Sequence, residues 1–304
     1  MPRNPVPVPE APSSASRLSL PDVMHGPQIL VASMSVPQPR GKSEEPWQYH
    51  SRSDLHSKVA CWGVFFDMLR TSALLGDHAR AGKVIFGVNF EMRDFATGRK
   101  KNLDLVIARP SGDESTGHRT LADLANQWGI VLNGPQEAEL AELPLITEGA
   151  LAGSGVLVAL EAKAAMTAHS KARPRLYDEL NSSHLTVHGA SNQALAVGLV
   201  MVNESDTFIS PERQIGTGRE VVSQHLQPGD AERIIRKVEE IPRRASAAHH
   251  GFDGLGIVVV RAANDGSPVQ LVARPPAPQP GEVFYYDDML SRVANEYDTR
   301  FAAI

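Results

Sequence analysis

One uninterrupted apolar run, ALAVGLVMV at 194–202, constrains the fold of this chain more than any other feature. A strand with one face in water alternates between apolar and polar residues, because successive side chains point to opposite faces of a sheet. A strand that is apolar at every position has to be covered on both faces, as the central strands of α/β sheets are. We therefore expect residues 194–202 to form a central strand with helices on both sides.

Three further β-like runs precede this strand. KVIFGVNFEM (83–92) and LDLVIA (103–108) flank a short basic turn that contains glycine, which predicts an antiparallel hairpin. A third strand is predicted over 156–164. The three runs can form a meander, and the step to 194–202 is a parallel crossover, so the sheet is expected to be of mixed direction.

Helical patterns flank these strands. One helix is expected to begin at Ser53 or Asp54, with Asp54 as the favoured cap, and to end near Leu75. A second helix is expected to begin at Pro174, because proline is common in the first turn. In the first helix, one side is predicted to face the sheet and another is small and polar. The sheet-facing side is Leu55, Val59, Trp62, Phe66 and Leu69, and the small and polar side is His56, Ala60, Gly63 and Asp67.

The chain divides by composition into three parts. Residues 1–48 are rich in Pro and Ser and are expected to form a poorly ordered tail. Residues 49–210 are predicted to form the core, with a helical insertion at about 110–153. Residues 211–304 are predicted to be a C-terminal α/β extension of unknown role that packs on the core. Its expected elements are a helix over 231–240, a strand over 257–262 and a helix over 287–301.

Charge and cysteine content exclude several classes of protein. The net charge is −5 and the isoelectric point is near 6.1, so nucleic acid would have to be bound by local basic patches. The single cysteine, Cys61, excludes an internal disulfide and suits a reducing compartment. The first residues lack the apolar centre of a signal peptide, and no apolar stretch is long enough to span a membrane. We expect a cytoplasmic protein without a membrane partner.

The third predicted strand contains two charges where an apolar core is expected. VLVALEAK (156–163) places Glu161 and Lys163 two residues apart, on one face of the strand. Burying unpaired charges is costly, so ionic groups in such a place need partners or a chemical role. An ordinary ion pair at the end of a strand is the simplest alternative.

A third ionic residue, Asp104, lies in the second predicted strand, where alternation puts it on the face of Val106 and Ala108. If the second and third strands pair, Asp104 and Glu161 lie close together. Two converging carboxylates repel each other unless a cation lies between them. Mg²⁺ is the natural candidate, because it takes oxygen ligands and commonly uses only one or two carboxylates.

This arrangement resembles the PD-(D/E)XK nuclease superfamily, which includes many type II restriction endonucleases. Asp104 in NLDLVIA matches the Asp of the pattern, and Glu161-Ala162-Lys163 matches its E-x-K, within the order helix, three strands, helix, strand. Leu103 stands where the pattern has Pro, a position that touches no metal. The resemblance covers about 53–203. It implies a restriction-endonuclease-like fold and Mg²⁺-dependent phosphodiester hydrolysis, with Mn²⁺ as a substitute, and Asp104, Glu161 and the Ala162 carbonyl as metal ligands.

Other residues are candidates for supporting roles. Gln193, ahead of the apolar strand, and Glu91, on the first strand, are possible accessory active-site residues. A loop glutamine and a solvated strand end are the simpler interpretations. Basic clusters can contact phosphates without reading sequence. The candidates are Arg99, Lys100, Lys101, Lys171, Arg173 and Arg175.

Two other kinds of site are disfavoured. His184 and His188 have the i, i+4 spacing of zinc ligands, but no H-E-x-x-H motif or cysteine pair accompanies them. The GSG at 153–155 precedes a strand, whereas a dinucleotide-binding loop follows one, so no nucleotide cofactor is expected.

The leading hypothesis is therefore an Mg²⁺-dependent DNA endonuclease of restriction or defence type. Double-stranded DNA is the expected substrate and a homodimer the expected assembly, because duplex DNA is itself two-fold related. A non-catalytic binding or assembly module with a nuclease-like fold is one alternative. A nuclease that acts on RNA, or on branched or single-stranded DNA, is another.

Overall fold

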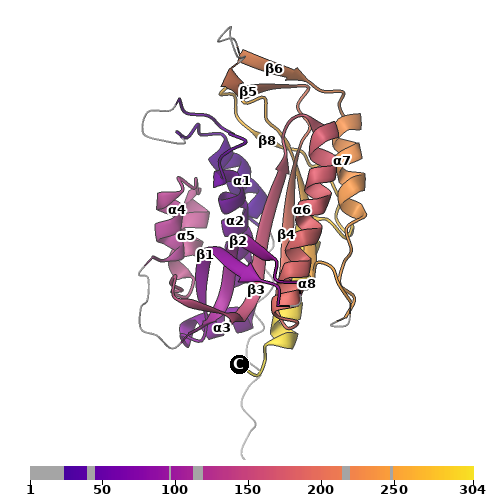
Figure 1. Ribbon diagram of the computed structural model, residues 1–304. Helices are drawn as coiled ribbons and strands as arrows, with labels where there is room; N and C mark the ends of the chain where they lie inside the picture. Colours follow the sequence, from indigo (N-terminus) through magenta and orange to yellow (C-terminus); the bar gives the residue numbers. More distant parts are fainter. Residues whose placement is uncertain (1–23, 40–44, 96, 112–118, 214–219, 247–248) are drawn as a thin grey trace, which may run out of the picture.

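A computed structural model describes residues 24–39, 45–95, 97–111, 119–213, 220–246 and 249–304. The chain forms a six-stranded mixed sheet in the order β1-β2-β3-β4-β7-β8, with helices on both faces (Figure 1). The α/β class and the mixed direction of the sheet are confirmed. The strands are β1 (Ile85–Arg93), β2 (Lys100–Pro110), β3 (Leu151–Ala165), β4 (Leu195–Asn203), β7 (Gly254–Arg261) and β8 (Gln270–Leu271).

The first three strands form the predicted antiparallel meander, and β4 joins β3 in parallel. Leu105 of β2 lies opposite Leu160 of β3, and Glu161 of β3 lies opposite Gly198 of β4. Every residue of β4 is buried, as the unbroken apolar run predicts. Its side chains contribute to two separate cores, one on each face of the sheet.

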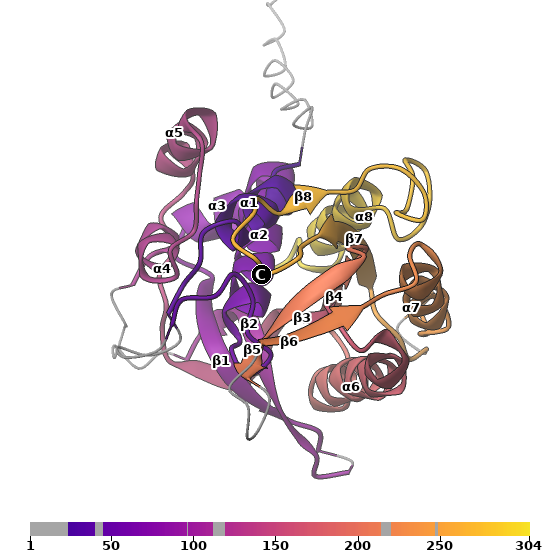
Figure 2. The same ribbon diagram turned by 90° about the horizontal axis from the view of Figure 1, so that it is seen from above.

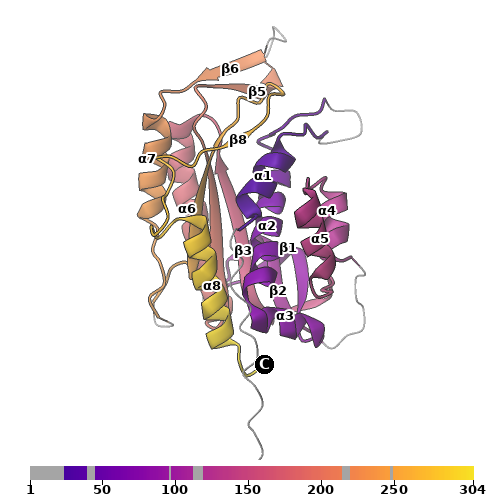
Figure 3. The ribbon, with the colours of Figure 1, turned by 180° about the vertical axis from the view of Figure 1, so that it is seen from behind.

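The two faces are covered by different helices (Figures 2 and 3). One face carries α1 (Gly26–Met34), α2 (Leu55–Thr71), α3 (Ala73–Arg80) and α8 (Tyr286–Arg300), and the other carries α6 (His169–Ala190) and α7 (Gly229–Glu239). The predicted insertion contains α4 (Leu121–Gln127) and α5 (Gly134–Glu142), each begun by a capping box. The predicted order helix, three strands, helix, strand is confirmed by α2, β1–β3, α6 and β4.

Helix α2 is buried on nearly all sides, which the sequence pattern did not predict. Its small and polar side packs against α1 and α8. A side chain at Gly63 would meet the backbone of Gly26 at 2.9 Å, so the two helices cross closely. Asp67 accepts hydrogen bonds from the backbone N–H of Gly26 and from the Tyr286 hydroxyl.

The capping of one helix and the start of another differ from the predictions, while α2 begins at Leu55, directly after Asp54, as predicted. Asp54 makes no side-chain capping bond and instead forms an ion pair with Lys58 at 2.7 Å, so the capping prediction is wrong. Helix α6 begins at His169, and Pro174 lies inside it rather than at its first turn. The helix tolerates the proline, whose missing N–H removes one internal hydrogen bond near the N-terminal end.

The N-terminal and C-terminal parts of the chain also differ from the predicted division into tail, core and extension. The prediction of a poorly ordered tail is wrong for 24–39, which contains α1, and for 45–48, where Gln48 is buried and hydrogen-bonded. Residues 1–23 and 40–44 lie outside the described part. The C-terminal extension does more than pack on the core, because β7 continues the same sheet in parallel beside β4. The hairpin of β5 (Thr207–Arg213) and β6 (Glu220–Gln224) was not predicted.

Within the described residues, no single helix is long and apolar enough to cross a membrane. Only α2 and α3 together would meet the requirement of length and composition, and this pair is bent by 95° at its break.

Candidate active site

A cleft of about 430 Å³ opens where β3 ends and α6 begins. Its walls come from four parts of the chain: the segment before α2 with the first turn of that helix, Asp104 of β2, the end of β3 with the following loop, and the first turns of α6. The crossover from β3 to α6 makes this opening, because the chain leaves the sheet there to start the helix.

Asp104 enters the cleft from β2 and is held from two directions. Its Oδ2 accepts a hydrogen bond of 2.9 Å from the backbone N–H of Ala162, and its Oδ1 accepts one of 3.1 Å from the Ser57 hydroxyl. The Cys61 thiol lies 4.0 Å from Oδ2. The carboxylate is therefore fixed between β3 and α2.

The orientation of Asp104 departs from simple alternation along β2. Val106 and Ala108 pack in the core on the α6 side, whereas Asp104 contacts α2, so the prediction that the three share a face is wrong. On the neighbouring strand β1, Asn89 lies at the corresponding point with a positive φ of 51°. The register is the same on both sides of this point, with Val88 opposite Leu105 and Phe90 opposite Leu103, but Asn89 and Asp104 do not pair, so the ladder is interrupted there.

Glu161 and Lys163 lie side by side, as the period of two predicts. Lys163 Nζ is 2.7 Å from Glu161 Oε1, and Glu161 is only 3% exposed. Lys101 Nζ lies 3.6 Å from the same carboxylate oxygen. From α6, Glu179 Oε2 lies 3.8 Å from Lys163 Nζ, while Oε1 of Glu179 lies 2.6 Å from Arg175. The cluster thus alternates carboxylates and cations from three elements.

Burial and charge set the pKa values of this cluster. Burial, together with the Glu161 carboxylate, raises the pKa of Asp104 from 3.8 to about 6. Burial alone would lower the pKa of Lys163, but Glu161 and Asp104 more than offset it and the pKa lies above 10.5. Lys163 is therefore protonated at neutral pH, and the Glu161 carboxylate destabilises the charged form of Asp104.

The donor set fits a hard divalent cation with few protein ligands. In the part of the chain that is described, no three His, Cys, Asp or Glu side chains gather as a metal site. Mg²⁺ needs fewer, since it commonly keeps several waters and uses one or two carboxylates. The nearby carboxylate of Glu161, which contributes to the raised pKa of Asp104, would be offset by a cation between the two groups.

The other predicted site residues fall into two groups. Lys171 and Arg175 line the cleft. Arg173 points elsewhere, into a groove between α6 and α7 that Arg233, Arg236 and Lys237 also line. Lys101 reaches Glu161 and is part of the buried cluster rather than a free phosphate contact.

Four predicted residues lie away from the cleft. Lys100 forms an exposed ion pair of 2.7 Å with Glu91, so Glu91 adds no carboxylate to the site. Arg99 is exposed in the turn before β2. Gln193 is exposed in the turn before β4, where the adjoining Leu195 pairs with Val158 rather than with Glu161. The simpler interpretations of Glu91 and Gln193 are supported.

Sequence reasoning missed several residues that line the cleft. Ser57 and Glu179 contact the predicted catalytic residues, but each lies on a helix with no motif around it. His56 is half-buried near Lys163, and burial together with that cation lowers its pKa to about 4. The Tyr49 ring lies tilted against His56, with ring centres 4.7 Å apart. The only available signal was their position near the start of a predicted helix.

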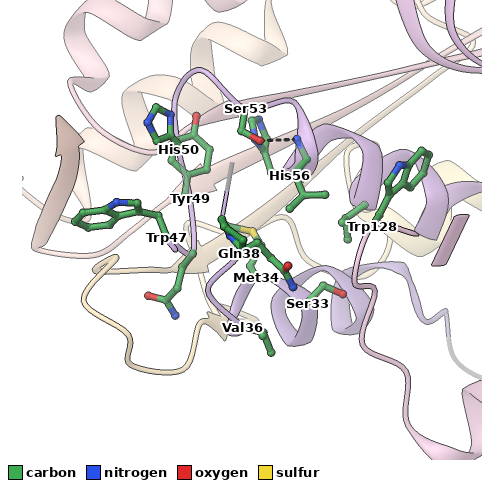
Figure 4. Close-up of a pocket in the computed structure, with 14 residues that line it drawn as sticks. Ser33, Met34, Val36, Gln38, Trp47, Tyr49, His50, Ser53, His56 and Trp128 are labelled. Carbon is green, nitrogen blue, oxygen red and sulfur yellow. Dashed lines mark hydrogen bonds between the residues drawn. The ribbon is translucent and has the colours of Figure 1, made fainter. Parts of the chain in front are cut away.

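A second, narrower pocket adjoins the cleft (Figure 4). Tyr49, Ser53 and His56 line both, so they form the shared wall. Trp47, His50 and Trp128 give the second pocket an aromatic lining.

Comparison of the chain with known protein families, with curated proteins and with solved structures finds no match.

Proposed function

We propose that this protein is an Mg²⁺-dependent endonuclease that hydrolyses phosphodiester bonds in DNA, on a restriction-endonuclease-like fold. One observation carries the proposal: Asp104 of β2 and Lys163 of the adjacent strand line one open cleft, and the buried Glu161, paired with Lys163, lies within electrostatic range of Asp104. A restriction or other defence role is the simplest setting for such an enzyme. We place it in the cytoplasm, which suits the one free cysteine, Cys61.

The proposed metal ligands are Asp104, Glu161 and the Ala162 carbonyl. A bound Mg²⁺ supplies a Lewis acid that polarises the phosphate and lowers the pKa of a bound water. Ser57 and the Ala162 N–H fix the orientation of Asp104, as partners behind a metal ligand do. Mn²⁺ is expected to substitute for Mg²⁺.

Lys163 is assigned an electrostatic role. Because its pKa is raised, it carries a positive charge at neutral pH and does not act as the base that takes a proton from water. A fixed ammonium at this position can orient the attacking water and offset the charge that builds up on the phosphate. Lys171 and Arg175 on the cleft wall are proposed to position the DNA backbone.

A non-catalytic binding or assembly module is the second candidate. The direct contact between Lys163 and the buried carboxylate of Glu161 favours it, since such a pair satisfies both charges without any substrate. Under this alternative, the cleft binds a partner and no bond is broken.

Cleavage of supercoiled plasmid separates the two candidates. We expect nicked or linear product with Mg²⁺ or Mn²⁺ and none with EDTA. Lys163→Met, which keeps most of the stem of the side chain, is expected to lower the rate by at least about 100-fold, as the loss of a preorganised stabilising group does. The matched control is Lys100→Met, because Lys100 also pairs with a glutamate but lies outside the cleft.

Equal cleavage by Lys163→Met and wild type would refute the assigned site. If wild type cleaves neither duplex DNA, single-stranded DNA nor RNA in either metal, the binding module becomes the better account. Cleavage of RNA alone would keep the chemistry and change the substrate. Sedimentation with and without a duplex tests the proposed homodimer.

A further inference from the structure

The segment just before α2 has no regular structure, yet it is held firmly by buried polar side chains. Gln48 donates from Nε2 to the carbonyl of Ser267 at 2.7 Å, and its Oε1 accepts from the N–H of Gly266 at 3.0 Å. The backbone of Trp47 pairs with Gln38 as an isolated bridge. The segment is therefore anchored to a loop more than 200 residues away in sequence.

Asn264 holds the next residue of the segment from both sides. Its Oδ1 accepts from the N–H of Tyr49 at 2.9 Å, and its Nδ2 donates to the carbonyl of Tyr49 at 3.1 Å. The same Nδ2 contacts the carbonyl of Ile209 at 2.7 Å. Asn264 is 3% exposed and has a positive φ of 60°. These contacts fix the position of Tyr49 at the mouth of the cleft.

The side chains that this framework presents are aromatic and only partly covered. Trp47 and Tyr49 are both half-buried. Figure 4 shows them on the same stretch of chain, near His50. Among the described residues, neither the Trp47 indole N–H nor the Tyr49 hydroxyl has a hydrogen-bond partner. A buried Tyr or Trp usually finds one, so both groups are available to a ligand.

Charged side chains lie next to the Tyr49 ring. Tyr49 lines the same cleft as the cations Lys163, Lys171 and Arg175 and the carboxylates Asp54, Asp104 and Glu179, and it lies within electrostatic range of Arg175. Proteins that bind single-stranded nucleic acid combine a basic groove for the backbone with aromatic rings on which bases stack. Here Trp47 and Tyr49 supply the rings, and Lys171 and Arg175 on the cleft wall supply the cations for the backbone.

We infer that Trp47 and Tyr49 form a stacking platform for an unpaired DNA base beside the scissile phosphate, so that the substrate is single-stranded DNA or DNA opened at the cleavage point. The inference rests on the proposed function for the place of the scissile phosphate. In a duplex the faces of each base are covered by its neighbours, and only an unstacked base exposes a face to an aromatic side chain. The inference narrows the substrate from DNA in general to DNA with unpaired bases.

Binding without cleavage tests this platform separately from the chemistry. The full chain is titrated in EDTA with a single-stranded oligodeoxythymidylate, with a duplex of equal length and with the equivalent oligouridylate. Trp62 and Trp128 are buried, so quenching of tryptophan fluorescence would come from Trp47. We expect the single strand to bind more tightly than the duplex and to quench the fluorescence, and Trp47→Phe to remove the quenching.

Loss of the stacking surface gives the quantitative test. Trp47→Ala and Tyr49→Ala are each expected to weaken single-strand binding about 5- to 150-fold, the effect of losing one stacked base. Tyr49→Phe should retain most of the binding, which separates stacking from misfolding. The matched control is Phe95→Ala, because Phe95 is 72% exposed and lies outside the cleft.

The outcomes distinguish the two proposals. Wild-type single-strand affinity in both alanine variants would overturn the platform, even if plasmid cleavage depends on Lys163. Weakened binding in these variants, with no cleavage of any substrate, would support the platform and overturn the nuclease. Preference for the duplex over the single strand would overturn the inference, and preference for oligouridylate would overturn its assignment to DNA.

Discussion

The buried carboxylate of Asp104 should make the free protein less stable than it would be with a neutral side chain. The pKa of Asp104 is raised from 3.8 to about 6, a shift of about two units, and each unit corresponds to about 1.4 kcal/mol. In this pH window the folded protein binds more protons than the unfolded chain, so the free energy of unfolding falls as pH rises through it. Above about pH 6 the cost reaches about 3 kcal/mol.

Asp104→Asn removes the charge and keeps the shape. The amide oxygen can still accept from the Ala162 N–H, and the amide N–H₂ can donate to the Ser57 hydroxyl. We expect the variant to be more stable than wild type by up to about 3 kcal/mol above pH 6, and the difference to disappear below about pH 4. Urea unfolding across this pH range measures it.

A control substitution and a titration with Mg²⁺ test whether the change in stability comes from the charge of Asp104. Asp77→Asn is the control, because Asp77 is 70% exposed in a surface ion pair and should change stability by less than about 0.5 kcal/mol. Added Mg²⁺ should stabilise wild type and not Asp104→Asn, because a ligand that binds only the folded state raises its stability. A less stable Asp104→Asn at neutral pH, or a gain that does not depend on pH, would refute the reasoning.

Three other substitutions test the framework around the site. Leu180→Ala should lower the free energy of unfolding by about 2–5 kcal/mol, because the side chain is fully buried in the core under α6. A loss below about 1 kcal/mol would contradict this packing. Gly254→Ala should lower the free energy of unfolding by about 1–3 kcal/mol, because a Cβ would lie 2.3 Å from Val293 of α8. Thermal unfolding measures the change, and an unchanged melting temperature would show that the neighbouring side chains move aside without cost. Asn264→Ala should speed amide hydrogen exchange at Tyr49, which loses its acceptor, and unchanged exchange would show that other contacts hold the segment.

The sequence predicted the parts of the fold that repeat a local pattern. The unbroken apolar run of β4 and the alternation of β3 identified two central strands and placed Glu161 beside Lys163. Pairing of β2 with β3 then brought Asp104 to the same cleft. These predictions succeed because each depends on only a few consecutive residues. The period of a strand shows which side chains share a face, and a charge within an apolar run marks a buried ionic group.

The remaining features depend on contacts between distant segments. Ser57 reaches Asp104 from α2 on one face of the sheet, and Glu179 reaches Lys163 from α6 on the other. No local pattern encodes which turn of each helix meets these strands. Asp104 turns toward α2 at a point where β1 and β2 do not pair, opposite Asn89 with its positive φ. The start of α6 was misplaced because Pro174 was taken as a boundary, whereas packing retains it inside the helix.

The anchoring of the segment before α2 has a consequence for the order in which the site is completed. Asp104, Glu161 and Lys163 all lie in the first two thirds of the chain, but the residues that hold Gln48 and Tyr49 in place lie at 264–267. During synthesis the charged cluster therefore leaves the ribosome long before the wall beside it can be fixed. A chain that stops before residue 264 has every proposed catalytic group and an unfinished cleft.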